Sequence, residues 1–439
     1  MTTTYLSDAA ATAARLPFLQ RLLRDRVVER LAGLQNGALA FSGPGSGGDA
    51  VCGKPDAELG CAHIEVRDGK FWSAVALRGA LGAGESFSAG HWRCEDPARV
   101  VRIMLRDRQV LDACESGIGS LFAPVLKLWH ALRPNSITGS KKNIAAHYDL
   151  GNDFFELFLD PSMTYSSGVF SPEDVGQGPQ ALQKAQGNKL RRLCQKLSLS
   201  AKDRLLEIGT GWGSMSMCAA GEFSARVTTT TISNRQFELA KERFAKAGLQ
   251  DRIELVEQDY RALQGQYDKL VNCEMVEAVG HQFLPGFFGR CASLLRPGGA
   301  MAMQAITIQD QQYGAALRHV DFIKRYVFPG SFIPSVTALV DAATKGSDFR
   351  LVHMEDFSRH YAETLRQWRV MLVQNRPAIL ARGYGEQFLR TWEWYLAYCE
   401  GGYAERYLGL AQLVFVRPGS ELRVDSSALA PVAVDPYQG

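Results

Sequence analysis

Runs of apolar residues separated by turn residues predict an alternation of strands and helices over the second half of the chain. Short apolar or β-branched runs predict strands that end near residues 208, 231, 257, 273, 306, 354 and 416. Apolar residues at helical spacing lie between several of them, as in residues 215–220 and 283–295, and residues 313–343 read as a helical insertion. This order predicts an α/β domain with an open sheet.

The first part of the chain shows a different pattern. Leu16, Leu23 and Leu31 belong to an apolar series at helical spacing, and five arginines decorate the same segment. This basic amphipathic helix is either a membrane-binding element or a domain helix with a solvated face. The same two interpretations hold for the basic helix predicted at 179–197. The remaining predictions here are a flexible loop at 41–60, strands at 63–67 and 71–78, and a helix at 97–108.

Composition narrows the class of protein. The 439 residues are 46% apolar and 22% charged, which suits two or three soluble globular domains. A net charge of +3 implies no general affinity for nucleic acid. The nine cysteines show neither a C-x-x-C pair nor a zinc spacing, so we expect free thiols in a reducing cytoplasm and no metal. No apolar run approaches the ~20 residues of a spanning helix, and the N-terminus lacks the apolar core of a secretion signal, so we expect any membrane contact to be peripheral.

Candidate chemistry begins at the turn after the first strand of this domain. Gly209, Gly211 and Gly213 tolerate positive φ and remove the Cβ atoms that would keep a nucleotide away. Glu207 lies at the end of the strand, where such sheets open their ligand crevice. The downstream order of strands, with an acidic position at Asp259, resembles the class I methyltransferase fold, which binds S-adenosylmethionine.

Other stretches of the chain resemble the cyclopropane fatty acid synthase family. The N-terminal signature of that family stands here as G-E-S-F at 84–87 and G-H-W at 90–92. More specific are H-Y-D-L-G-N-D-F-F at 147–155 and M-T-Y-S-S at 163–167. F-I-K-R-Y-V-F-P-G at 322–330 is similar to the segment that covers the acyl chain in the family.

The resemblance implies the residues that bind the cofactor. Tyr148 and Tyr165 suit a sulfonium, because a cation over an aromatic face gains about 0.5–2 kcal/mol. Without the flanking motifs both would be read as core tyrosines. The T-x-S-x-x-Q motif implies hydrogen bonds from its side chains to adenosine, and Asp259 would accept from the adenine amine. The full cofactor-binding set is Tyr148, Tyr165, Ser166, Glu207, Gly209, Gly211, Trp212, Gly213, Thr231, Ser233, Gln236, Asp259 and Tyr260.

The resemblance also implies the catalytic residues. In the family a bound bicarbonate ion removes the proton after methyl transfer, and it is held by side chains and backbone amides. Glu277 and Tyr361 match the residues that hold it, and Ile306 would supply a backbone amide. Two positions depart from the pattern, since Ser167 replaces the usual Cys and Gln304 replaces a common His. Both can still donate hydrogen bonds, so the departures put ring closure in question more than methyl transfer.

These observations predict an S-adenosylmethionine-dependent C-methyltransferase of unsaturated acyl chains in phospholipid, with a cyclopropane, a methyl-branched or a methylated chain as product. The fold expected is a Rossmann-like class I methyltransferase sheet of seven strands, with a helical acyl-binding insertion and a smaller N-terminal α+β domain. We expect a lipid- or membrane-associated domain at 1–130, the methyltransferase domain at 131–420 and a loose tail at 421–439.

Two rival functions stay open at this point: a small-molecule N-methyltransferase and a catalytically silent lipid-binding relative. The N-terminal signature argues against the first, because the alkaloid N-methyltransferases that share the tyrosine motifs generally lack that domain. Glu277, Tyr361 and the complete glycine turn argue against the second. The expected partners are the phospholipid membrane surface, on the inner face of the membrane, and a second copy of the chain in a homodimer.

Overall fold

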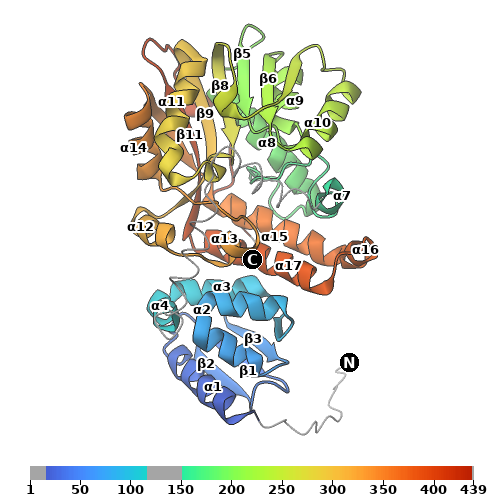
Figure 1. Ribbon diagram of the computed structural model, residues 1–439, viewed down its shortest axis with the longest axis vertical. Coiled ribbons are helices and arrows are strands. Elements are labelled where there is room, and N and C mark those ends of the chain that lie inside the picture. The colour runs from blue at the N-terminus through green and yellow to red at the C-terminus, as the bar shows by residue number, and fades with distance from the viewer. Residues whose placement is uncertain (1–15, 116–150, 438–439) are drawn as a thin grey trace. The chain divides into compact units, whose positions relative to one another are not determined.

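The computed structural model describes residues 16–115 and 151–437. The described chain divides into two compact units, residues 16–115 with 385–394, and residues 151–384 with 395–437. Figure 1 shows the elements of both units, coloured along the chain.

Residues 16–115 of the N-terminal unit form a four-stranded sheet with four helices. Its sheet has the order β2-β1-β3-β4, in which β1 lies parallel to β3 and the other two pairs are antiparallel. Its elements are α1 (Phe18–Leu31), β1 (Gly37–Ser42), β2 (Ala50–Lys54), β3 (Cys61–Val66), α2 (Lys70–Ser88), β4 (Trp92–Cys94), α3 (Pro97–Arg106) and α4 (Arg108–Glu115). This is the α+β architecture expected.

Two predictions for this unit are wrong. The Gly-rich segment at 41–60 carries most of a β-hairpin rather than a flexible loop, since β1 and β2 pair from Gly37↔Lys54 to Phe41↔Ala50. Residues 71–78 are helical rather than extended. A short apolar run does not distinguish strand from helix, and here Phe71 and Trp72 are adjacent and both buried, as on the core side of a helix.

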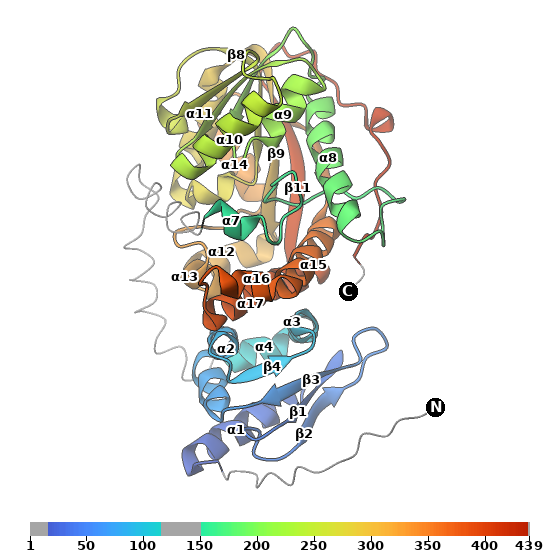
Figure 2. The ribbon, with the colours of Figure 1, turned by 90° about the vertical axis from the view of Figure 1, so that its right-hand side faces the viewer.

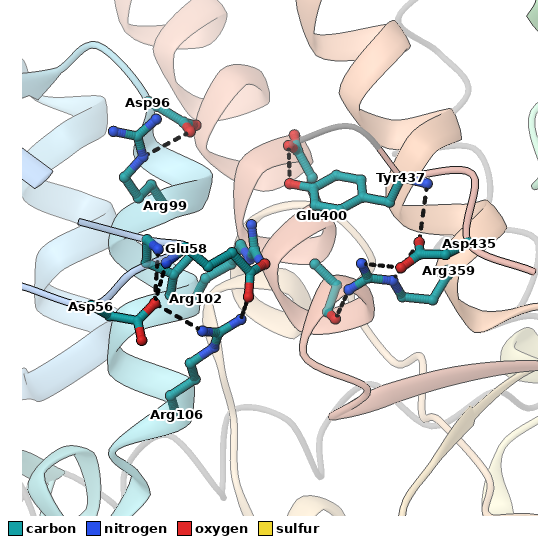
Figure 3. Close-up of polar contacts among 12 residues, drawn as sticks. Asp56, Glu58, Asp96, Arg99, Arg102, Arg106, Arg359, Glu400, Asp435 and Tyr437 are labelled. Carbon is teal, nitrogen blue, oxygen red and sulfur yellow. Dashed lines mark hydrogen bonds and ion pairs between the residues drawn. The ribbon is translucent and has the colours of Figure 1, made fainter. Parts of the chain in front are cut away.

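The family signature has a packing role in this unit. Trp92 is buried, donates from Nε1 to the carbonyl of Ala83 at 3.0 Å, and meets the ring of Phe87 edge-on at 5.0 Å. Ser86 Oγ lies 3.2 Å from Nδ1 of His91. The signature therefore ties the end of α2 to β4. Figure 3 shows the ion pairs that Asp56 and Glu58, in the segment between β2 and β3, form with Arg102 and Arg106 of α3.

The second unit contains a seven-stranded sheet of order β10-β11-β9-β8-β5-β6-β7, as expected for a class I methyltransferase. β7, β6, β5, β8 and β9 are parallel, and β11 is antiparallel to both β9 and β10. The strands are β5 (Arg204–Ile208), β6 (Arg226–Thr231), β7 (Ile253–Glu257), β8 (Tyr267–Cys273), β9 (Leu295–Ile308), β10 (Arg350–Asp356) and β11 (Leu408–Val416).

Helices cover both faces of this sheet (Figures 1 and 2). Successive strand residues face opposite sides, so Leu205 packs with residues of α8–α10 while Leu206 packs with residues of α11 and α14. The first group is α8 (Pro179–Lys196), α9 (Ser214–Gly221) and α10 (Asn234–Lys246), and the second is α11 (Leu284–Leu294) and α14 (Val336–Gly346). The two faces form separate apolar cores, one on each side of the strands.

The remaining helices and turns lie mainly beyond the carboxyl ends of the parallel strands. They are α7 (Asn152–Phe155), η2 (Tyr260–Ala262), η3 (Val276–Ala278), η4 (His281–Phe283), α12 (Asp310–Arg318), α13 (Phe322–Tyr326), α15 (Ser358–Gln374), α16 (Arg376–Ala381) and residues 395–404 of α17 (Glu386–Ala404), with η5 (Ser426–Ala428) in the C-terminal segment. α12 to α14 form the helical insertion predicted at 313–343. No described helix combines the length and hydropathy needed to cross a membrane.

The segment after β11, expected to be a loose tail, makes specific contacts within the second unit. Asp435 forms an ion pair with Arg359 of α15, and the Tyr437 hydroxyl donates to the Glu400 carboxylate at 2.9 Å (Figure 3). Upstream, the Ala433 amide donates to the carbonyl of Phe170. These contacts lay the segment along α15 and α17, the helices that carry part of the site described below.

Candidate active site

The glycine turn after β5 has one open position and two packed ones. Its glycines have φ of +100° at Gly209, +53° at Gly211 and +93° at Gly213. A Cβ on Gly213 would come within 2.4 Å of the Phe244 ring, and one on Gly209 would lie 3.2 Å from the Met275 side chain. Gly211 has nothing within 4 Å of that position. Gly211 is therefore the point at which a ligand can approach the backbone closely.

Glu207 is the penultimate residue of β5 and is buried. Its carboxylate accepts hydrogen bonds from the hydroxyls of Ser216 and Thr229, the latter at 2.7 Å. Burial raises the pKa of Glu207 to about 7, against the opposing effect of these hydroxyls and of the Lys189 ammonium. A carboxyl held in this way at the mouth of the turn suits a polar ligand group beside Gly211.

The residues predicted to contact adenosine gather at the carboxyl ends of β6 and β7. Thr231 donates to the side-chain oxygen of Gln236 at 2.9 Å, and Ser233 caps α10 by accepting from the Gln236 amide. Asp259 accepts two hydrogen bonds from the Arg261 guanidinium, at 2.7 and 2.8 Å. The structure brings these residues together at one edge of the sheet, and each already has a protein partner.

Several aromatic residues lie near the glycine turn. Trp212 is buried and donates from Nε1 to Asn152 of α7 at 2.8 Å. The hydroxyl of Tyr165 lies 2.9 Å from that of Tyr395, and its ring lies 5.2 Å from Trp368. Tyr260 lies further along, edge-on to Phe287, and burial raises its pKa to about 12. Tyr148, the other tyrosine predicted to face the sulfonium, is outside the described residues.

The donors predicted to hold an anion converge on Glu274. Its Oε1 accepts from the Ser167 amide at 3.0 Å and from Gln304 Nε2 at 2.8 Å, and its Oε2 accepts from the Tyr361 hydroxyl at 2.7 Å. Glu274 directly follows β8 and is partly buried, and the burial of its carboxyl raises its pKa. Three donors from three separate segments thus share one carboxylate of the chain itself.

Backbone conformation sets Glu274 apart as well. Its φ is +50°, in the left-handed region that residues other than glycine rarely adopt. Its amide donates to the Gln304 carbonyl at 2.8 Å, so strand β9 holds the residue at this angle. Strain of this kind costs of order 1–3 kcal/mol and concentrates at functional sites.

Glu277 has a different set of contacts. Its Oε1 accepts from the Ile306 amide at 2.6 Å, while its Oε2 is buried and has no partner within the described part of the chain. Burial, and then the neighbouring charge of Glu274, raises the pKa of Glu277 to about 8. The two partly buried carboxyls therefore form a pair in which Glu274 holds the donors and Glu277 holds a proton near neutral pH.

The donors expected to bind bicarbonate are all in use. The Ser167 hydroxyl donates to the Gly168 carbonyl, and Gln304 Nε2 also donates to the Ser167 carbonyl at 3.2 Å. The Ile306 amide donates to Glu277. The residues present therefore fit the two carboxyls of the chain and not an additional anion.

Lys189 of α8 is a buried cation beside this pair. Its Nζ lies 2.5 Å from Ser166 Oγ and 3.4 Å from the Cys273 sulfur, and its side chain is fully buried. Its charge lowers the pKa of both Glu207 and Glu274 against the effect of burial. The interpretation of helix 179–197 as a solvated or membrane-facing basic surface is wrong for this residue, and for Arg192 and Lys196, which are also buried.

Sequence reasoning missed Glu274 and Lys189. Two glutamates lie three residues apart after β8, and only Glu277 matches the family motif, although Glu274 directly follows the strand. Lys189 belongs to the apolar side of α8, four residues after Ala185 and four before Leu193, both buried. That spacing could have identified Lys189, because a lysine at an apolar position of an amphipathic helix points to the protein core and not to solvent.

Comparisons with known proteins agree with this geometry. Residues 135–413 match the family described as mycolic acid cyclopropane synthetase. The chain is 37% identical to the tuberculostearic acid methyltransferase of Mycobacterium tuberculosis over 79% of its own length and 81% of that protein's. It is 32% identical to the cyclopropane-fatty-acyl-phospholipid synthase of Escherichia coli, over 81% and 88% of the two lengths. A mycolic acid cyclopropane synthase complexed with SAH and CTAB superimposes with a TM-score of 0.58 at 27% identity, covering 63% of this chain and 98% of that one.

The sheet order, the open glycine turn and these relatives agree on one class of protein, an S-adenosylmethionine-dependent methyltransferase that acts on lipid acyl chains. Within that class, the chain belongs to the mycolic acid cyclopropane synthetase family, whose model matches well over half of it.

Proposed function

We propose that this enzyme transfers a methyl or methylene group from S-adenosylmethionine to a double bond of an unsaturated fatty acyl chain in membrane phospholipid, and that Glu274 is the base. The observation that carries the proposal is the convergence of Ser167, Gln304 and Tyr361 on the Glu274 carboxylate. That carboxylate lies one residue from Met275, whose side chain borders the glycine turn.

The chemistry sets three requirements for the chain. An isolated alkene is a weak nucleophile, and S-adenosylmethionine supplies the strongly electrophilic methyl group that it needs. As the π pair forms the new C–C bond, positive charge develops on the other alkene carbon, and aromatic faces such as those of Tyr165 and Trp368 suit that charge. A base must then accept a proton from the cationic chain.

Glu274 meets the requirement for a base. Its hydrogen bonds are all accepted ones, which stabilise the ionised form, and the Lys189 charge acts in the same direction. Burial opposes ionisation and so makes the carboxylate more basic than one in water. Glu277 retains its own proton, which limits the negative charge in the pocket to one carboxylate.

The proton that Glu274 removes decides the product. If a C–H bond of the new methyl group breaks, its electron pair closes a cyclopropane ring on the cationic carbon. If a C–H bond of a neighbouring chain carbon breaks, the pair forms a double bond and the methyl group stays as a branch. Both outcomes add one CH2 unit and release one proton, so they have the same mass.

The N-terminal unit offers a surface for a bilayer. Phe18 is 80% exposed and Leu19 63%, and Leu22 follows one turn later at 42%. Arg21 and Arg26 are exposed on the same helix. Apolar side chains next to arginines suit the interface of an anionic membrane, so we include peripheral binding through α1 in the proposed function. The expected homodimer stays a prediction for a measurement of solution mass.

Product analysis tests the proposal. Purified protein, S-adenosylmethionine and vesicles of monounsaturated phospholipid should give acyl chains heavier by one CH2 unit. Mild hydrogenation then separates the products, because a ring resists it and a retained double bond takes up two hydrogens. Methylation of a small amine without any change in lipid would establish the N-methyltransferase alternative instead. An absence of both products, with S-adenosylmethionine bound, would favour the silent lipid-binding relative.

A further inference from the structure

A line of buried polar side chains leads away from the candidate base through the sheet. Gln304 of β9 and Gln412 of β11 are direct neighbours in the strand register, and Gln412 Nε2 donates to Gln304 Oε1 at 2.9 Å. On its other side, Gln412 Oε1 accepts from Lys196 Nζ at 2.8 Å. Lys196 belongs to α8, and its side chain and those of both glutamines are at most 1% exposed.

The lysine at the end of this line fixes its direction. An ammonium group has donors and no acceptor, whereas a glutamine amide has one end of each kind. Gln412 must therefore turn its oxygen to Lys196, which leaves its NH2 group for Gln304. Gln304 must then turn its oxygen to Gln412 and its NH2 group to Glu274. Every hydrogen bond in the line points toward the Glu274 carboxylate.

Lys196 is held in place on its far side. Its Nζ lies 2.5 Å from Glu355 Oε2 of β10, and the same carboxylate receives two hydrogen bonds from Arg192. His353 is the other titratable group facing it from β10, and the Phe357 ring lies 5.3 Å from Nζ. The ion pair supplies the opposite charge that a buried ammonium requires.

We propose that Lys196 and Gln412 are positioning residues for the reaction, which orient the Gln304 amide so that its N–H group, and not its oxygen, faces Glu274. This inference rests on the proposed function of Glu274 as base. Without the Lys196 ammonium, both glutamines can turn over together and keep the hydrogen bond between them, while Gln304 gives up its hydrogen bond to the Ser167 carbonyl. The Gln304 oxygen would then face the Glu274 carboxylate across 2.8 Å, where two acceptors repel and the protonated acid is favoured.

The groups around Glu274 determine how this would appear in a pH profile. Besides Gln304 of β9, it faces Lys189 of α8, Glu277 of η3, Tyr361 of α15 and Tyr403 of α17. None of these changes when Lys196 is replaced. The loss of Lys196 should therefore raise the pH above which the enzyme turns over, in addition to lowering the rate.

The experiment compares Lys196→Met and Gln412→Met with Arg192→Met. Arg192 is the matched control, since it is a buried cation of the same helix that binds the same Glu355 but does not contact Gln412. Turnover of monounsaturated phospholipid vesicles is followed from acid to alkaline pH, with S-adenosylmethionine affinity and thermal unfolding of each variant. We expect kcat to fall about ten- to a hundred-fold in Lys196→Met and Gln412→Met, as for the loss of one hydrogen bond to a charged group. Cofactor affinity should be unchanged in both variants. The acid limb of the profile, meaning the pH range in which activity rises from acid pH, should be displaced to higher pH. Arg192→Met should keep the wild-type profile.

The outcomes separate the two proposals. The inference is overturned if the wild type is active and both Lys196→Met and Gln412→Met show the same pH profile as Arg192→Met. It is also overturned if these two variants turn over more slowly but their acid limb is not displaced. If Lys196→Met does not fold, Gln412→Met decides, because it keeps the Lys196–Glu355 pair. A wild type that produces no CH2-enriched chain overturns the proposed function, and with it the inference.

Discussion

Two glutamates three residues apart differ in every contact that matters for chemistry. Glu274 accepts three hydrogen bonds and Glu277 one, and the second oxygen of Glu277 is buried without a partner among the described residues. Ionising both would place two negative charges in one buried pocket, so the carboxyl with fewer donors keeps its proton. The environment, and not the residue type, assigns the roles of base and neutral acid.

The raised pKa of Glu277 predicts a pH dependence of stability. In the unfolded chain this carboxyl loses its proton near its ordinary pKa of 4.5, whereas in the folded protein it keeps the proton up to about pH 8. Between these values the folded state binds more protons, so the free energy of unfolding should fall as pH rises. Glu277→Gln has no such proton to lose. Urea unfolding from pH 5 to 8.5 should therefore show a shallower decline for the variant than for the wild type, and parallel curves would contradict the assignment.

At the scale of the element, the sequence predicts the strands of the sheet well and the contacts between elements in the site poorly. Each parallel strand is a short apolar run, and the glycine turn directly follows the first of them, so both could be predicted from the sequence. The contacts of Lys189 and Gln304 depend on which elements pack together, and no local pattern contains that information. The wrong prediction at 71–78 has the same origin, because only packing separates a buried helix from a strand in a short apolar run.

The glycine turn gives a prediction at this scale. Gly211→Val should abolish most S-adenosylmethionine binding, because a branched side chain would fill the open space at this position. Gly248 at the end of α10 is a matched control, since its φ is +66° and it also has nothing within 4 Å of its Cβ position. Both variants carry a similar backbone strain of about 1–2 kcal/mol. Calorimetry should show lost affinity in Gly211→Val alone, and equal affinities in the two variants would refute the placement of the cofactor.

At the scale of the whole molecule, the two units divide the task. The methyltransferase unit contains the predicted cofactor and acid–base residues that the structure describes, whereas the exposed apolar residues Phe18, Leu19 and Leu22 lie on α1 of the N-terminal unit. Three cations of the basic helix α8 are buried, which argues against the membrane-facing interpretation of that helix. In the proposed function, recruitment to a bilayer is therefore assigned to α1.

Membrane binding should accordingly respond to changes in α1. Replacing Phe18 and Leu22 together by Ser should weaken binding to anionic vesicles about ten-fold or more, because each buried apolar side chain contributes roughly 1.5–3 kcal/mol. Val434→Ser is the control, as Val434 is 95% exposed in the other unit. Co-sedimentation at low and high salt measures both the apolar and the electrostatic part. Unchanged binding of the Phe18 and Leu22 variant would mean that another surface meets the membrane.

The most direct test of the account is the turnover of Glu274→Gln beside that of the wild type and Glu277→Gln. The glutamine keeps the shape of Glu274 but cannot accept a proton. Phospholipid vesicles, S-adenosylmethionine and each protein should yield CH2-enriched acyl chains with the wild type, and at least about 10²-fold less with Glu274→Gln, as for the loss of a general base. Cofactor affinity should be the same in all three proteins, and Glu277→Gln, which keeps a neutral group at 277, should be affected far less. Glu274→Gln turning over like the wild type while Glu277→Gln is inactive would contradict the account and return the role of the base to Glu277.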